Sequence, residues 1–70
     1  MWTVELTADY RGHRGRIVTD MHRHRVADIP SAVRVTHARW QIVARRRGTT
    51  LHARYTADHG QVITRTLRQE

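Results

Sequence analysis

The sequence has no cysteine, no lysine and no phenylalanine, and it has a single serine and a single proline. Without cysteine there is neither a disulfide framework nor a thiolate metal site, and a reducing cytosol is the compartment that such a chain fits best. Most of the residues that supply a nucleophile are missing, and a small sheet has little room for a deep pocket. The composition therefore favours a binding protein over an enzyme, and no cofactor is expected.

Long apolar runs are also absent. No segment approaches the roughly 20 apolar residues of a membrane span, and residues 1–5 lack the basic-then-apolar order of a secretion signal. We therefore expect a cytoplasmic protein without membrane contact. A chain of 70 residues forms one domain, residues 1–70, and such a domain buries only about 60% of its unfolded surface. Because its stability is expected to be marginal, a homo-oligomer in which a second copy covers an open face is one way to complete the core.

Charge is what the sequence has in excess. Thirteen basic residues, all of them arginine, stand against six acidic ones, for a formal charge of +7. This balance favours a polyanionic partner, with nucleic acid (DNA or RNA) first and an acidic protein second. A biased genome composition also produces arginine without lysine, so the choice of arginine does not by itself establish a partner.

The clearest structural signal is strict alternation of apolar and polar residues over residues 2–10, which predicts a strand with one buried face. Two glycines in residues 11–15 predict a turn, and residues 16–21 predict the returning strand of a hairpin. Residues 49–57 alternate in the same way, and residues 61–67 follow the turn 58–60 as a further strand. Gly48 and Gly60 mark the chain reversals because glycine reaches positive φ without a Cβ clash.

Residues 31–47 are ambiguous. Their apolar residues spread around much of a helical wheel, whereas two short strands divide them better, with Val33 and Val35 in one and Trp40 and Ile42 in the other. The favoured fold is therefore an all-β antiparallel meander of five or six strands, either barrel-like or completed by oligomerisation. The alternative is a helix over residues 31–47 with Ser31 as its N-cap, which gives a winged helix with residues 49–67 as the wing.

Arginine side chains are the candidate binding residues, because a guanidinium contacts phosphate oxygens in a two-pronged geometry and gives affinity without sequence readout. The predicted turn 45–48 carries three in a row, and the strands beside it add two more. A second cluster occupies the first hairpin loop. The predicted nucleic-acid-binding residues are Arg45, Arg46, Arg47, Arg54, Arg65, Arg11, Arg14 and Arg16.

Two alternatives remain open. A protein-binding regulator or assembly module would use the same basic face on an acidic partner. Residues 40–67 resemble the strand–turn–strand end of compact toxin ribonucleases over less than half of the chain, and this resemblance implies a metal-independent ribonuclease with His52, Arg54, Tyr55 and His59 as its site residues. A metal site is not expected, because His22 and His24 have no cysteine and few carboxylates to join them.

Overall fold

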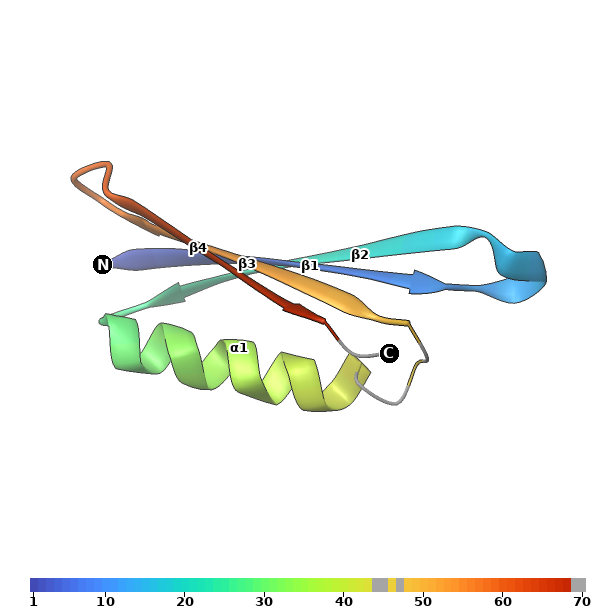
Figure 1. Cartoon of the computed structure of the whole chain (residues 1–70). Coiled ribbons are helices and arrows are strands. Elements are labelled where there is room, and N and C mark those ends of the chain that lie inside the picture. The colour runs from blue at the N-terminus through green and yellow to red at the C-terminus, as the bar shows by residue number, and fades with distance from the viewer. Residues whose placement is uncertain (44–45, 47, 69–70) are drawn as a thin grey trace.

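One antiparallel sheet and one helix make up the computed structural model, which describes residues 1–43, 46 and 48–68. The chain order is strand, 3-10 turn, strand, helix, strand, strand (Figure 1). The strands pair in the spatial order β2-β1-β3-β4, so the sheet is open, with β2 and β4 at its edges. The elements are β1 (Trp2–Arg11), η1 (His13–Gly15), β2 (Ile17–Val26), α1 (Ile29–Val43), β3 (Thr50–Ala57) and β4 (Val62–Arg68).

Strand β1 lies at the centre of the fold. It pairs with β2 over its whole length and with β3 from Trp2 to Asp9. Its even-numbered residues point toward α1, and Val4, Leu6 and Ala8 are buried there. The alternation predicted from the sequence is confirmed for β1 and also for β3, whose buried residues are Leu51, Ala53, Tyr55 and Ala57. The core is therefore the layer between one face of the sheet and α1.

The strands predicted within residues 31–43 are wrong, because the segment is helical from Ile29 to Val43. The helix buries a stripe at helical spacing that includes Ala32, Thr36 and Val43. The partly buried Ile29, Val35 and Trp40 pack against the core on the same side, while Thr36 at the centre of the stripe is polar and interrupts the apolar pattern. Thr36 is accommodated because its Oγ1 donates to the Ala32 carbonyl (2.9 Å) and lies 2.8 Å from the Tyr55 hydroxyl.

The mostly β character of the prediction is confirmed, and its strand count is corrected. Four of the five or six expected strands correspond to β1–β4, and the segment expected to hold the remaining strands forms α1, as in the helical alternative, so the described residues form an open four-stranded sheet. Strand β2 also extends to Val26, well past the expected end at Met21, as an edge strand with little cover. Gly48 and Gly60 have the predicted positive φ, at 71° and 94°. Among the described residues, no helix has the length and apolar character needed to cross a bilayer.

The N-terminus of α1 is capped by Asp28, and the prediction that Ser31 is the N-cap is wrong. Asp28 Oδ1 accepts a hydrogen bond of 2.8 Å from the Ser31 backbone N–H, and the Asp28 carbonyl accepts one from Ala32. Pro30 fits in the first turn because its missing N–H would have no partner inside the helix. The hydrogen bond from the Ser31 backbone, followed by that from its side chain and by the charge of Arg34, lowers the pKa of Asp28 from its ordinary value.

This cap makes stability depend on pH in the acid range. Because the folded pKa of Asp28 is depressed, its contribution is fully present above the ordinary carboxyl pKa and is lost as the pH falls through the lowered value. Asp28→Ala is expected to lower the melting temperature at pH 7, and its difference from wild type should shrink as the pH approaches 2. Asp28→Asn is the control, because it keeps an accepting oxygen and removes the titration. Thermal unfolding followed by circular dichroism from pH 2 to pH 7 measures the melting temperatures of both variants. If the difference in melting temperature between Asp28→Ala and wild type stays constant over this range, Asp28 is not a cap that titrates.

Candidate nucleic-acid interface

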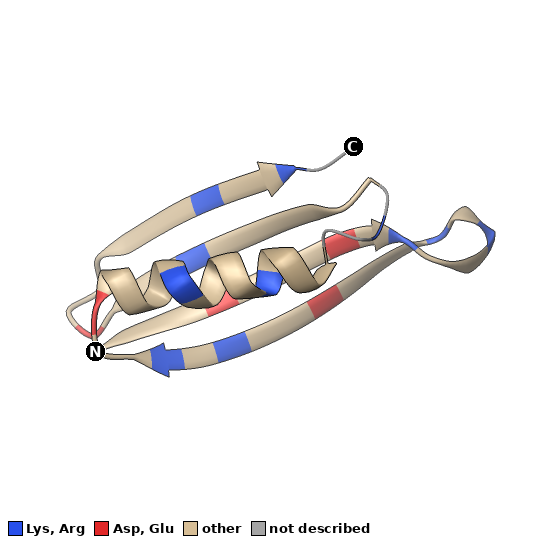
Figure 2. Cartoon of the chain, turned by 90° about the horizontal axis from the view of Figure 1, so that it is seen from below, with Lys and Arg blue, Asp and Glu red and all other residues tan. Residues whose placement is uncertain are grey.

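Arg46, from the first predicted arginine cluster, lies at the same end of the molecule as the second cluster, which occupies the β1–β2 hairpin. The β1–β2 hairpin continues past the end of α1 as a protruding arm (Figures 1 and 2). Arg46, between α1 and β3, sits over the ring of Tyr10 near the end of β1, at the base of this arm. Arg45 and Arg47, which belong to the same predicted cluster, lie outside the described residues.

Arg46 is held in place by contacts on several sides. Its guanidinium carbon is 3.9 Å from the centre of the Tyr10 ring, and its Nη1 is 3.1 Å from Asp20 Oδ2 in β2. Its backbone N–H donates to the Val43 carbonyl (3.0 Å), and its carbonyl accepts from the buried Thr49 hydroxyl, which also donates to Val43. Arg46 therefore fastens the helix–strand connection to the base of the arm, a role that the sequence analysis did not foresee.

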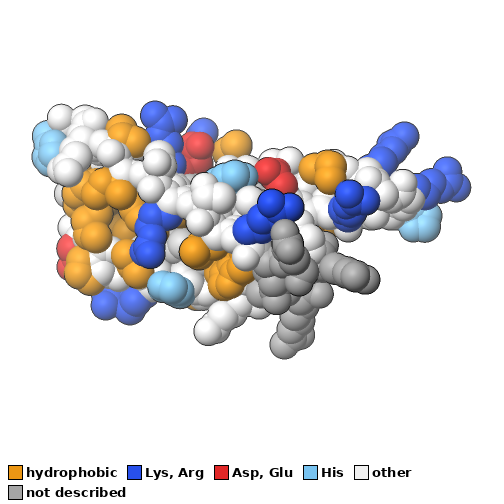
Figure 3. Space-filling model, viewed as in Figure 1, with side chains coloured by type: hydrophobic (Ala, Val, Ile, Leu, Met, Phe, Trp, Pro, Cys, Tyr) orange, Lys and Arg blue, Asp and Glu red, His pale blue; other side chains and the backbone are white. Residues whose placement is uncertain are grey.

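The tip of the arm is a tight basic turn. The Gly12 N–H donates to the Arg16 carbonyl at 2.7 Å, and a Cβ at Gly12 would lie only 2.6 Å from Val18 Cγ2. Arg14 adopts a left-handed backbone conformation with φ of 60°. Its side chain and that of Arg16 are exposed, and basic side chains project from this end of the molecule (Figure 3).

Each aspartate and glutamate among residues 1–43, 46 and 48–68 has a partner other than the arginines of residues 11–16. Glu5 pairs with Arg23 (3.1 Å) and Asp58 with Arg25 (3.2 Å), at positions distant in the sheet from the arm tip. Asp28 caps α1, and Asp20 pairs with Arg46. Asp9 accepts from the Thr19 hydroxyl (2.7 Å) and lies 3.4 Å from His52 Nε2. Within the described part of the chain, the arginines that have no carboxylate partner are Arg11, Arg14, Arg16, Arg34, Arg39, Arg54 and Arg65.

Arg54 and Arg65 lie away from the β1–β2 arm. Arg54 is opposite Glu5 and Thr64 in the middle of the open sheet face. Arg65 is opposite Ala53, so it lies on the other face, the one that carries α1. The predicted binding residues therefore divide into a cluster at the arm and two isolated side chains on opposite faces.

The residues implied by the ribonuclease resemblance converge only in part: His52 and Arg54 line one pocket on the open face of the sheet, and Tyr55 and His59 lie away from it. Tyr55 is buried, and its hydroxyl contacts Thr36 in the core. His52 points to the opposite face of β3, where it lies near Asp9 and Thr66. His59 is in the turn beyond the end of β3, with its ring edge-on to Trp2 at 6.3 Å. No group of three or more potential metal ligands is found among the described residues.

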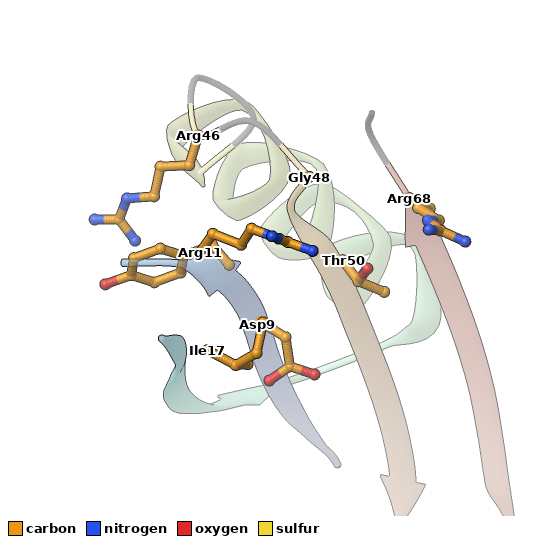
Figure 4. A pocket seen from close by; sticks show the side chains of 8 residues that line it. Asp9, Arg11, Ile17, Arg46, Gly48, Thr50 and Arg68 are labelled. Atoms are coloured by element: carbon orange, nitrogen blue, oxygen red, sulfur yellow. The ribbon is translucent and has the colours of Figure 1, made fainter. Parts of the chain in front are cut away.

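An open groove of about 860 Å³ lies at the base of the arm (Figure 4). Arg11 extends across it toward Thr50, and Arg68, the last residue of β4, forms the far wall. Strand register explains this meeting, because Thr50 pairs with both Asp9 and Arg68. Arg68 is not in the predicted site, and nothing in its local sequence distinguishes it. The groove is lined by Asp9, Tyr10, Arg11, Ile17, Arg46, Gly48, Thr50 and Arg68.

Comparison of the chain with protein-family models, curated proteins and solved structures finds no match. Geometry and charge are therefore the basis for assigning a function.

Proposed function

We propose that the protein binds nucleic acid, chiefly through contacts between backbone phosphates and the arginines of the β1–β2 arm. The observation that carries the proposal is the density of arginine along the arm: Arg14 and Arg16 at the tip and Arg11 at the base occur within six residues that contain no carboxylate. Each lacks an ion-pair partner among the described residues. Unpaired guanidinium groups that are close together suit a ligand with regularly spaced negative charges.

The shape of the arm also fits this partner. A two-stranded β-ribbon is narrow enough to enter the major groove of duplex DNA, and it can equally follow a phosphate backbone. Because the proposed contacts are to backbone phosphates, which carry no sequence information, we expect little sequence specificity.

Arg14 adds a second argument. A left-handed conformation costs a residue with a Cβ roughly 1 kcal/mol, and glycine avoids this cost. Arg14 nevertheless occupies such a position, with φ of 60°, and makes no ion pair with the described residues. The hairpin turn needs positive φ at both Arg14 and Gly15 (φ of 75°), a geometry that glycine or asparagine adopts at lower cost, so the turn does not account for an arginine side chain here.

The winged-helix version of the proposal would assign the contacts to α1 and the β3–β4 hairpin. Its cations are more dispersed: Arg34, which is hydrogen-bonded to Ser31 Oγ (2.9 Å), and Arg39 lie on α1, and Arg54, Arg65 and Arg68 are spread over β3 and β4. The arm is therefore the better surface for a polyanion. An acidic protein partner remains the second candidate, because the same unpaired charge would serve it.

Removing the two arginine charges at the tip of the arm is expected to lower both the affinity for nucleic acid and the salt dependence of that affinity. The double variant Arg14→Gln/Arg16→Gln should bind a labelled 20-base-pair duplex roughly tenfold more weakly at low salt. The slope of log K against log salt should fall by about 2, because each phosphate contact contributes about 0.9. Fluorescence anisotropy over a salt series measures both quantities, with single-stranded DNA and RNA as further probes.

The matched control is Arg54→Gln/Arg65→Gln, which removes the same charge from positions away from the arm. Its affinity should stay within about twofold of wild type, and circular dichroism should show that both double variants are folded. Equal losses in the two variants would contradict the arm as the binding surface. No binding of any probe by the wild type at modest salt would contradict nucleic acid as the partner and favour an acidic protein.

A further inference from the structure

We propose that the groove at the base of the arm holds one unpaired nucleotide, so that the protein prefers nucleic acid that contains a single-stranded position. This inference rests on the proposed function and names its substrate more closely. The arm supplies contacts to the backbone, and the groove beside it takes a nucleotide that is free of the duplex stack.

Cations and a hydroxyl line one side of the groove. Arg11 reaches across it, Arg68 stands opposite, and Thr50 lies between them (Figure 4). Gly48 contributes only backbone atoms to the groove. The space beside its Cα is open, because a Cβ built there would meet no atom within 4 Å. Two guanidinium groups with a hydroxyl and an exposed backbone segment form a suitable site for a phosphate.

The rest of the lining suits a base better than a second phosphate. The Arg46 guanidinium rests on the Tyr10 ring, and its side chain is 44% exposed. A base can stack on the outer plane of a guanidinium, as it does on an aromatic ring. Ile17 is 65% exposed and adds an apolar surface. The Asp9 carboxylate repels phosphate, but it accepts hydrogen bonds from the amino groups of bases.

Size and shape also favour a nucleotide. At about 860 Å³, the groove is within the range of sites for small organic ligands and much larger than a phosphate ion requires. Bases in an intact duplex are stacked and paired, so only an unpaired base can present its face and edge to such a groove.

The test compares a blunt 20-base-pair DNA duplex with the same duplex carrying one unpaired nucleotide. Wild type is expected to bind the bulged duplex roughly five- to tenfold more tightly by fluorescence anisotropy. Arg68→Gln should reduce this ratio to about twofold or less. Arg65→Gln, which removes the same charge from the same strand on the opposite face, should keep the wild-type ratio. Ile17→Thr should also lower the ratio, and it preserves a β-branched residue in the strand.

The outcomes separate the two proposals. Failure of the wild type to bind either duplex would overturn the proposed function and this inference with it. Equal binding of the two duplexes, together with a loss on Arg14→Gln/Arg16→Gln, would overturn the groove alone. The groove proposal would also be overturned if Arg68→Gln and Arg65→Gln showed the same ratio of affinities for the bulged and blunt duplexes. An Asp9→Asn variant that changes the order of preference among the four bulged bases would support contact with the base itself.

Discussion

Replacing Leu6 by alanine is expected to lower the free energy of unfolding by about 3 kcal/mol, within the range of about 2–5 kcal/mol for truncation of a buried leucine. Leu6 is fully buried in the central strand, between Ala53 of β3 and His22 of β2 in the register. Alanine would leave a cavity under α1 that its neighbours cannot fill without moving the strand. A domain of this size is stable by only about 4–10 kcal/mol, so the loss should be a large share of the total.

The matched control is Ile42→Ala. Ile42 is 64% exposed on α1, so removing a similar number of carbon atoms there should change stability by less than about 0.5 kcal/mol. Urea unfolding followed by circular dichroism measures both variants. Equal effects at the two positions would mean that the core is not where the structure places it.

Removing the hydroxyl of Thr36 is expected to cost more than removing the hydroxyl of Tyr55. Thr36 Oγ1 donates to the Ala32 carbonyl, so the Tyr55 hydroxyl must be the donor in the 2.8 Å contact between them. Thr36→Val leaves the Tyr55 hydroxyl buried without an acceptor, at a cost of about 1–3 kcal/mol. Tyr55→Phe leaves Thr36 with its bond to Ala32, and the cost should be about 1 kcal/mol or less.

The double variant sharpens this prediction. Thr36→Val/Tyr55→Phe removes both hydroxyls together, so no buried donor is stranded, and it should be more stable than Thr36→Val alone. The four proteins form a thermodynamic cycle whose coupling energy urea unfolding can measure. Additive losses would show that the two hydroxyls do not interact.

Sequence alternation predicted the sheet well where one face is buried and the other open. This holds for β1 and β3, in which every second residue packs against α1. It failed for residues 31–43 because Thr36, a polar residue, lies at the centre of the buried stripe, and its partner Tyr55 is 19 positions away. Alternation also predicted an end for β2 that is too early, because an edge strand with little cover does not need alternating apolar residues.

The sequence shows where arginine is concentrated but not how those arginines are arranged in space. A count of arginines identified both clusters, and the structure places Arg46 and Arg11 at one groove. Arg68 enters that groove only through the pairing of β4 with β3, which no local pattern reveals. The separation of paired from unpaired arginines likewise depends on where each carboxylate lies in three dimensions.

The basic edge strand β4 has a consequence for aggregation. Open edges are templates for pairing with another chain, and like charges along them oppose it. The edge strand β4 carries Arg65 and Arg68, whereas the charges of Arg23 and Arg25 on β2 are offset by ion pairs with Glu5 and Asp58. Two copies that approach each other along β4 are therefore expected to repel each other. A polyanion that neutralises these charges would remove the barrier, so we expect mixtures near charge balance to turn cloudy and to clear again when either component is in excess.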